Sequence, residues 1–322
     1  MSRALVVAGA ALLAASPLVA QDAARPAAHV LVVSGIGGTP EYVELFYEQA
    51  SGLVAAARER WGLPEDRVTW LSEDPSRAPG RIAGRSTREA LQAQIATLAG
   101  RVGSDDRVLI VLIGHGTATA DGAKLNLPGP DLTGAELGAW LDALPTRSVA
   151  VVNTSSASGG FLPALAAEGR IVVTATRSAR EAERTHFGGF FVEAFADEGA
   201  DTDKDRRVSL QEAFAYARDE VERYYERENQ LQTEHPMLED GAGGALAAAF
   251  HLAPAASEAA ASDNPAVALL QAEKARIEQE IAALRIRRAR MEPAEYDAAF
   301  EVLALELASI NRTIRAVEEA GP

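Results

Sequence analysis

Short apolar runs rich in β-branched residues alternate along this chain with longer segments that mix apolar and polar positions. Uninterrupted Val, Ile and Leu runs of this length are typical of strands covered on both faces. The runs are 29–34, 68–71, 108–114, 149–153 and 171–176, and the helix-like segments between them are 42–61, 87–100, 133–143 and 161–168. This alternation predicts a mainly parallel sheet with crossover helices, in which ligands bind beyond the carboxyl ends of the strands.

A different pattern begins after residue 262. Apolar residues recur there with alternating spacings of four and three, as in a coiled-coil seam: Tyr296, Phe300, Leu303, Leu307, Ile310, Ile314 and Val317. Upstream, the same template fits Val267, Leu270, Ile277, Ile281 and Leu284, and Pro293 can begin a second helix. We expect an antiparallel helical hairpin over 263–322, joined by the linker 253–262 to an α/β domain over 29–250. Such a hairpin can serve as a stalk, a packing arm or a surface for a protein partner or self-association.

The first twenty residues have the features of a secretory signal peptide. Arg3 supplies an early positive charge, 4–15 form a short apolar core, and small residues precede the polar pair Gln21-Asp22. The sequence therefore predicts a signal peptide over 1–20 and a secreted or periplasmic protein. No later stretch is long and apolar enough to predict a membrane span.

Composition and charge exclude several classes of function. The 322 residues include 31 Lys and Arg against 46 Asp and Glu, for a formal net charge of -15. A nucleic-acid partner is not expected, because phosphate binding depends on concentrated basic residues. The chain has no Cys, which excludes a disulfide, a Cys-ligated zinc ion and a cysteine nucleophile. The glycine-rich turn at 34–40 departs from a dinucleotide-binding motif at Pro40, so no organic cofactor is expected.

Two strand ends carry residues that suit nucleophilic chemistry. The run 108–114 leads to His115-Gly116, and the run 149–153 leads to a cluster that contains Ser155 and Ser156. If these strands are neighbours, the imidazole and a hydroxyl can come within hydrogen-bond reach, as base-assisted attack requires. The turn 158–160 could offer N–H groups to a developing oxyanion. A His flanked by Gly and a Ser-rich turn are also common in ordinary loops, so both interpretations stay open.

These residues resemble the legumain branch of the caspase-like cysteine peptidases. An apolar strand that ends in His-Gly is followed, about forty residues later, by an apolar strand that ends in a small-residue cluster with Ser-Gly. The resemblance runs from residue 29 to residue 244 and includes a secreted bacterial group with similar segments, here 37–42, 126–132 and 234–236. It implies a caspase-like three-layer α/β/α sandwich, a peptide or protein ligand in the cleft, and His115 in the general-base position.

The chain departs from this family at the nucleophile. Legumain-like enzymes have Glu-Ala-Cys-Glu-Ser-Gly where residues 154–159 read Thr-Ser-Ser-Ala-Ser-Gly, so Ser156 replaces the thiol. A serine hydroxyl is almost wholly protonated near neutral pH and is the weaker nucleophile. No obvious carboxylate is fixed by the sequence to orient His115, although Asp121 and Asp131 lie within reach of the same loop. The hypothesis is a peptidase homologue that is inactive as a cysteine peptidase. The alternatives are a serine-type hydrolase with a His115–Ser156 dyad and a peptide-binding scaffold whose hairpin recruits a partner.

An acidic segment at 201–212 has the spacing of a calcium-binding EF-hand loop. Oxygen-bearing side chains occupy loop positions 1, 3, 5, 9 and 12, and the carbonyl of the residue at position 7 completes the set: Asp201, Asp203, Asp205, Ser209, Glu212 and Arg207. Position 6 is Arg206 instead of the usual glycine. The other interpretation is a capping box, with Ser209 as the N-cap of a helix that runs to residue 228. Both can hold, and we expect a structural cation site weaker than a full EF-hand.

Overall fold

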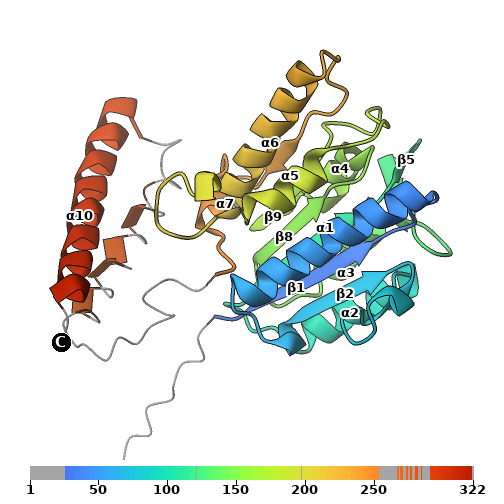
Figure 1. Ribbon diagram of the computed structural model, residues 1–322, viewed down its shortest axis with the longest axis horizontal. Helices are drawn as coiled ribbons and strands as arrows, with labels where there is room; N and C mark the ends of the chain where they lie inside the picture. Colours follow the sequence, from blue (N-terminus) through green and yellow to red (C-terminus); the bar gives the residue numbers. More distant parts are fainter. Residues whose placement is uncertain are drawn as a thin grey trace, which may run out of the picture.

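A seven-stranded sheet forms the centre of the molecule (Figure 1). The structure is a computed structural model that describes residues 26–120, 122–196, 198–253 and 291–320, with part of the segment 267–284. In sheet order the strands are β10 (Met237–Glu239), β9 (Arg170–Thr174), β8 (Ser148–Asn153), β4 (Arg107–Ile113), β1 (Ala28–Ser34), β2 (Val68–Ser72) and β3 (Gly84–Arg85). Neighbouring strands run parallel apart from β9 and β10. The predicted mainly parallel sheet is confirmed.

Helices cover both faces of this sheet. One face packs against α1 (Pro40–Glu59), α5 (Phe187–Ala194), α6 (Leu210–Arg227) and α7 (Ala245–Ala249). The other face packs against α2 (Arg88–Ala99), α3 (Gly134–Leu141) and α4 (Leu162–Leu165). The protein therefore has a three-layer α/β/α fold, as expected.

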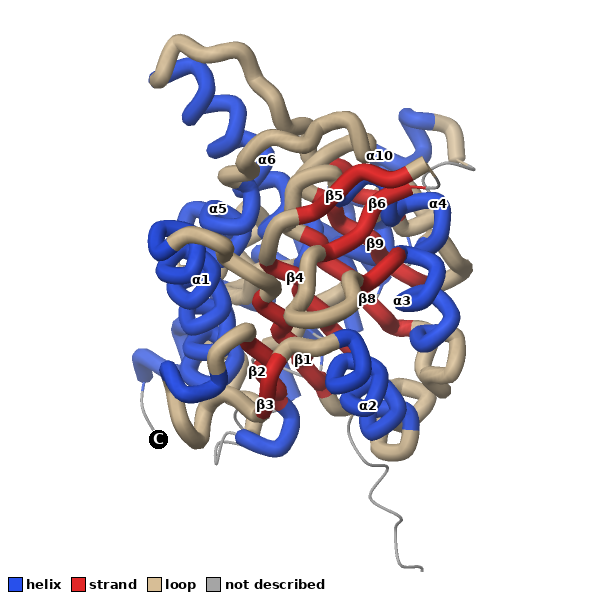
Figure 2. Tube along the Cα trace, turned by 90° about the vertical axis from the view of Figure 1, so that its right-hand side faces the viewer, coloured by secondary structure: helices blue, strands red, loops and turns tan. Residues whose placement is uncertain are grey.

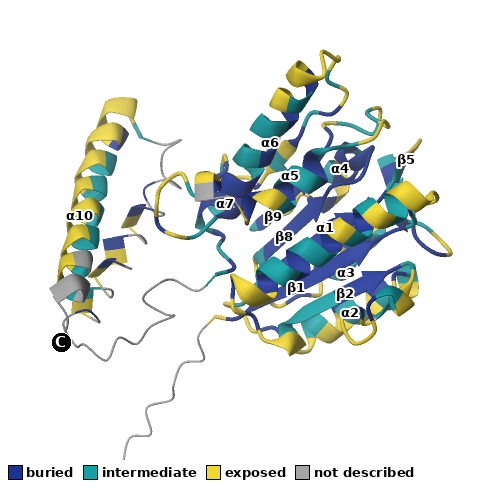
Figure 3. Cartoon of the chain, viewed as in Figure 1, coloured by how far each residue is buried: buried dark blue, intermediate teal, exposed yellow. Residues whose placement is uncertain are grey.

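The pleat of each central strand divides its side chains between two hydrophobic cores. In β1, Val30 and Val32 belong to the core on the α1 side, whereas Leu31 and Val33 belong to the core on the α2 side. Every residue of β1 is buried, and Figure 3 shows the central strands as a buried layer. Successive side chains of a strand point to opposite faces, and both faces meet helices here. This is why the sequence contains unbroken apolar runs instead of alternating ones.

The helix starts follow local capping chemistry. At the start of α6, the Ser209 hydroxyl accepts a hydrogen bond from the Glu212 N–H, while the Glu212 carboxylate accepts one from the Ser209 N–H. Thr133 and Glu136 form the same reciprocal pair at the start of α3. Each pair satisfies N–H groups that the helix itself leaves without partners. The capping box predicted at Ser209 is confirmed.

Two features differ from the expected elements. A separate antiparallel sheet, β5 (Gly116–Thr119), β6 (Gly122–Leu125) and β7 (Leu132–Thr133), follows β4, and its strands are too short and too polar to stand out in the pattern. The helix expected over 161–168 is wrong in its length. The chain first forms a 3₁₀ turn (Ser158–Phe161), and α4 ends at Leu165 because Ala166 is extended, with ψ 121°.

The C-terminal region contains a long helix, α10 (Pro293–Ala320), which begins at the predicted proline. Its expected seam residues are buried or half-buried, whereas Val302 and Leu305 are exposed. The described residues within 267–284 are helical, and Val267, Ile277 and Leu284 are buried.

The predicted signal peptide and the linker beyond Ala253 lie outside the described residues. Among the helices that the structure describes, none has both the length and the apolar character needed to span a membrane.

Candidate functional site

Strands β4 and β8 are hydrogen-bonded neighbours, and this places His115 and Ser156 at the same edge of the sheet. The two strands pair in parallel from Arg107 opposite Ser148 to Leu112 opposite Asn153. Since parallel strands end at the same edge, His115 follows one strand where the Ser cluster follows the next. The Thr154 N–H also donates to the Leu112 carbonyl, which extends the register beyond β8. The adjacency on which the predicted site depends is confirmed.

The His115 side chain is turned toward α1 and the end of β1. Its Nε2 lies 3.3 Å from the carbonyl oxygen of Gly37. The ring packs edge-on against Tyr42 and Phe46, with centroid distances of 4.4 Å and 5.0 Å. The imidazole is thus fixed by two aromatic rings and one main-chain contact. A small hollow beside it, between the end of β1 and α1, is lined by Phe46 and by Ser34, Glu73 and Arg77 among others.

The Ser156 hydroxyl is bound to the main chain of Gly116. The Gly116 N–H donates to Ser156 Oγ at 3.0 Å, and Ser156 Oγ donates to the Gly116 carbonyl at 3.1 Å. Ser155 Oγ, which is fully buried, donates instead to Asn153 Oδ1 at 2.7 Å. Within the described residues, no hydrogen bond joins His115 to either hydroxyl. The site therefore brings both candidate groups to one edge but does not form the dyad contact.

Gly116 occupies a position that has no room for a side chain. A Cβ atom there would lie 2.0 Å from the Ser156 carbonyl oxygen and 3.1 Å from Ser155 Oγ. The start of β5 therefore touches the backbone of the loop that follows β8. This close approach is the reason for a glycine directly after His115.

The N–H groups of the turn after Ser156 already have hydrogen-bond partners within the protein. Ala157 has a left-handed backbone with φ 56°, and its N–H donates to the Glu181 carbonyl. The Gly159 N–H donates to Thr176 Oγ1, and the Gly160 N–H donates to the Ala157 carbonyl. The expectation that the turn 158–160 offers N–H groups to an oxyanion is therefore not met at Gly159 and Gly160 in this conformation.

The loop after β8 also interlocks with the loop after β9. A Cβ atom on Gly159 would lie 2.2 Å from the Ser178 nitrogen and 2.6 Å from the Thr176 carbonyl oxygen. Ser158 Oγ is within 3.2 Å of Thr176 Oγ1 and accepts a hydrogen bond from the Thr176 N–H. The two loops are thus in backbone contact at the point where they frame Ser156.

The carboxylates considered as partners for His115 do not take that role in the described residues. Asp131 Oδ1 accepts a hydrogen bond from the Leu127 N–H, at 3.3 Å, within its own loop. Asp121 lies outside the described residues. No carboxylate therefore orients the imidazole among the residues that the structure describes.

Two carboxylates that were not predicted from the sequence, the half-buried Glu181 and the buried Glu234, hold the loops around the site. Glu181 accepts hydrogen bonds from the main-chain N–H groups of Arg177 and His235, forms an ion pair with the Arg177 side chain, and lies 2.9 Å from His235 Nδ1. Glu234 accepts from the N–H groups of His186 and Phe187 at the start of α5. Burial raises the pKa of Glu234 to about 7. The segment 234–236 appeared in the sequence only as part of the family resemblance, since nothing in its pattern marks it as a cap.

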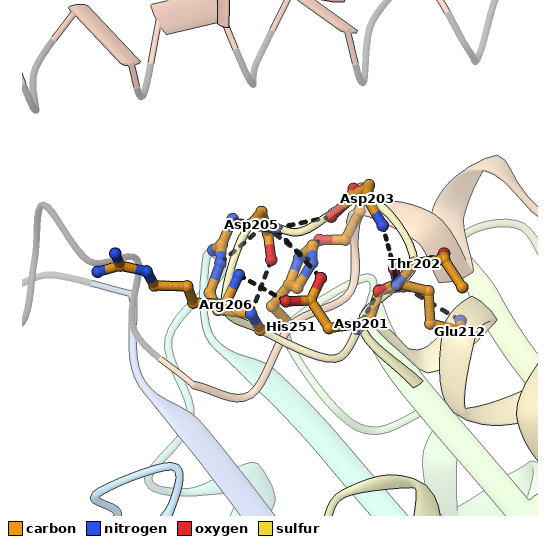
Figure 4. Close-up of polar contacts among 10 residues, drawn as sticks. Asp201, Thr202, Asp203, Asp205, Arg206, Glu212 and His251 are labelled. Atoms are coloured by element: carbon orange, nitrogen blue, oxygen red, sulfur yellow. Dashed lines mark hydrogen bonds and ion pairs between the residues drawn. The ribbon is translucent and has the colours of Figure 1, made fainter. Parts of the chain in front are cut away.

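The acidic loop brings three of its predicted ligands together (Figure 4). Asp201, Asp203 and Asp205 each place a carboxylate oxygen within 4.8 Å of the others, so this triad could hold a metal ion. The loop turns through Lys204 and Arg206, whose φ angles are 59° and 70°. Arg206 thus adopts the left-handed conformation that position 6 requires, although it is not glycine.

The remaining predicted ligands of this loop have other partners. Glu212 Oε2 accepts from the Ser209 N–H and hydroxyl, and Glu212 Oε1 accepts from the Thr202 N–H and hydroxyl. Arg207 forms an ion pair with Asp205 at 2.7 Å. His251 Nε2 lies 3.8 Å from Asp205 Oδ2, and burial, aided by the Arg207 guanidinium, holds the pKa of His251 below its usual range. The capping box and the acidic triad therefore coexist, and Glu212 belongs to the capping box.

Comparisons with known proteins reach only a distant structural likeness. No family model matches the chain, and no curated protein matches it. One similar solved structure is the protein GSU0716 from Geobacter sulfurreducens, with 14% sequence identity and a TM-score of 0.45. The match covers 66% of this chain and 93% of that chain.

Proposed function

We propose that this chain is a legumain-like member of the caspase-like peptidases that binds peptides without cleaving them. The observation that carries the proposal is the hydrogen bonding of Ser156, the residue in the nucleophile position. Ser156 stands where the family has a thiol, and its hydroxyl is engaged with both main-chain groups of Gly116. His115 makes its own contact with Gly37 and is not positioned to remove the Ser156 proton. An alcohol without a general base is a poor nucleophile.

The test compares labelling and turnover in matched variants. A fluorophosphonate probe and a mixture of fluorogenic peptides are applied to the wild-type chain, Ser156→Ala and His115→Ala. The proposal predicts no labelling and no turnover above that of the Ser156→Ala control. Labelling of the wild type that both substitutions abolish would contradict it.

A serine-type hydrolase is the second candidate, favoured by one observation. His115 and Ser156 follow adjacent, parallel strands and therefore lie at one edge of the sheet. Ser156→Cys tests whether the site keeps the geometry for a thiol. Reaction of this variant with a peptidyl chloromethyl ketone, lost in Ser156→Cys with His115→Ala, would show that His115 still activates a nucleophile at this position.

The acidic loop supports a separate, structural proposal, in which the ion is calcium. Three carboxylates converge on one point, and oxygen ligands of this kind suit hard cations. Calorimetric titration of the wild type with calcium should show binding in the millimolar range, and Asp203→Asn should weaken it. Glu239→Gln, on β10 outside the loop, serves as the control. No heat with the wild type at millimolar calcium would refute the proposal.

A further inference from the structure

The strand that follows His115, β5, is an edge strand. In the sheet order β5-β6-β7, β6 is its one partner strand among the described residues, and three of its four residues are exposed. Figure 2 shows β5 at the surface, beyond the end of β4. Strand edges present main-chain N–H and C=O groups with which another extended chain can pair.

The hydrogen bonds of Gly116 identify which groups of β5 face outward. Gly116 stands opposite Leu125 of β6, yet its N–H and C=O are both bound to Ser156 Oγ, so they point away from β6. The direction of these groups alternates along an antiparallel strand. The N–H and C=O of Ala118 therefore point to the same outer edge. In the described part of the chain, neither group of Ala118 has a hydrogen-bond partner on that edge.

Ser156 makes the contacts at Gly116 that a paired strand would make. Its hydroxyl accepts from the N–H and donates to the C=O of one residue, as the two main-chain groups of an opposing residue do in a hydrogen-bonded pair. The next residue whose N–H and C=O point to the outer edge is Ala118, two residues and about 7 Å further along the strand. An extended chain that pairs with Ala118 therefore runs directly toward Ser156 and the candidate site.

We propose that β5 is the place where the peptide binds, as an added strand that pairs with the main chain of Ala118. Because the Ser156 hydroxyl is already bound to Gly116, the pairing of the peptide with β5 ends before Gly116. This inference rests on the proposed peptide-binding function and gives that function a location and a mode of recognition.

The side chains of β5 define the class of peptide. Thr117, Ala118 and Thr119 are small and uncharged, and the strand contains neither the Pro nor the Lys with which exposed edges are commonly protected. A partner strand of about four residues matches this length. Its recognition depends on main-chain hydrogen bonds and on cross-strand contacts with two threonines. An uncharged segment with β-branched side chains suits both, since such residues favour extended structure and pair well with threonine.

The experiment uses the full chain, labelled with ¹⁵N, and the probe peptide acetyl-Thr-Val-Thr-Val-Thr-amide. We expect the largest amide shifts at Ala118 and its neighbours in β5. A probe in which alternate amides are N-methylated should bind at least about fivefold more weakly, because it loses hydrogen bonds worth about 1 kcal/mol each. Because recognition is through uncharged groups, the affinity should change little between low and high salt.

Three variants test the geometry. Ala118→Pro removes the outward N–H and should abolish binding, while the matched control Ala118→Ser keeps this N–H and should retain it. Ser156→Ala removes the hydroxyl but keeps the loop backbone beside Gly116, so the peptide gains no partner there and its affinity should stay close to that of the wild type. The N-methylated probe, which changes the peptide and not the protein, keeps the test decisive even where the proline disturbs the β5–β6 hairpin.

The outcomes separate this inference from the proposed function. Peptide shifts confined to other segments, such as 177–186, with β5 unaffected would overturn the edge inference and leave peptide binding intact. The absence of any β5 shift at millimolar peptide, or weaker binding by Ser156→Ala, would also overturn it. Hydrolysis of the probe that depends on Ser156 would overturn the proposed function, whatever the binding mode.

Discussion

Ala157 and Arg206 each hold a left-handed backbone conformation, with φ angles of 56° and 70°. For a residue with a side chain this conformation costs roughly 1–2 kcal/mol. Local hydrogen bonds hold both residues in place, since the Ala157 N–H donates to the Glu181 carbonyl and the Arg206 N–H donates to Asp201. Strained residues that are held by their surroundings cluster at functional sites. Here they lie beside Ser156 and within the acidic triad.

Replacing Arg206 with glycine should stabilise the acidic loop. The substitution removes the left-handed cost but adds chain entropy to the unfolded state, so the net gain is about 0.5 kcal/mol. It also removes a positive charge next to three carboxylates, so calcium affinity should rise several-fold. Urea unfolding measures the first effect and calorimetry the second. Arg206→Lys, which keeps both the charge and the strain, is the control, and an equal gain in that variant would contradict the explanation.

Gly116→Ala should displace the loop that contains Ser156. The added Cβ would lie 2.0 Å from the Ser156 carbonyl oxygen, which is main chain and cannot rotate away. We expect a loss of about 3 kcal/mol in the free energy of unfolding, at the upper end of the range for overpacked sites. Gly103→Ala, where the nearest atom would be 3.7 Å away, is the matched control. Equal stability of the two variants would show that the loop adapts freely.

At this scale the sequence predicted where His115 and Ser156 lie but not which groups they contact. The runs before His115 and before Ser156 were sufficient to predict that both lie at one sheet edge. The partner of the Ser156 hydroxyl depends on the register of β5, and the short polar strand 116–119 leaves no periodic signal from which a register can be predicted. Of the two contacts of Glu212, only the one with Ser209 could be predicted, because the capping box is a local sequence pattern. The contact with Thr202 depends on how the acidic loop folds.

Among the elements, α5 depends on a carboxylate from a distant part of the chain. Its N-cap residue, His186, provides no side-chain cap, and Glu234 accepts the hydrogen bonds of the first N–H groups instead. Glu234 has an exposure of 1%, so its charged form is poorly solvated. Desolvation raises its pKa from the ordinary 4.5 to about 7. The protonated form is therefore favoured by folding.

The stability of the protein should fall as pH rises through this range. A carboxyl group whose folded pKa is above its unfolded value contributes stability that is complete below about 4.5 and lost as pH rises through about 7. Between pH 5 and pH 8, Glu234 should reduce the free energy of unfolding by about 2 kcal/mol. Urea unfolding of the wild type and Glu234→Gln at both pH values isolates this contribution. An identical pH dependence in the two proteins would contradict the shift.

Strands were predicted correctly where both of their faces are buried, and helices where their apolar pattern or their capping residues are visible in the local sequence. The central strands and α1, α2, α3 and α6 lie within a few residues of the expected ranges. Helix α5 was not predicted, because its cap comes from residue 234 and its Gly188-Gly189 pair weakens the helix signal. Strand β10, which has three residues and two exposed side chains, was not predicted either.

For the molecule as a whole, the two hydrophobic cores end with the α/β domain. Both are built from described residues no later than Ala253, whereas the buried residues of the C-terminal region, such as Ile277 and Tyr296, belong to neither. In Figure 1, α10 lies apart from the central sheet. The division into two domains that is expected from the change in apolar spacing after residue 262 stays a prediction.

A chain that ends at residue 253 should therefore fold on its own. We expect its thermal midpoint to differ from that of the full chain by less than about 3 °C, which corresponds to about 1 kcal/mol for a domain of this size. Differential scanning calorimetry of both chains provides the measurement. A broad, non-cooperative transition in the shorter chain would show that the hairpin completes the core.

Gly159 has one further consequence, which concerns how this protein can evolve. Because backbone meets backbone there, neither loop can drift in sequence or length without the other adapting to it. Substitutions that reshape the segment 177–186 should therefore appear together with changes around Ser156, and engineering of one loop will succeed only when both are varied in the same library.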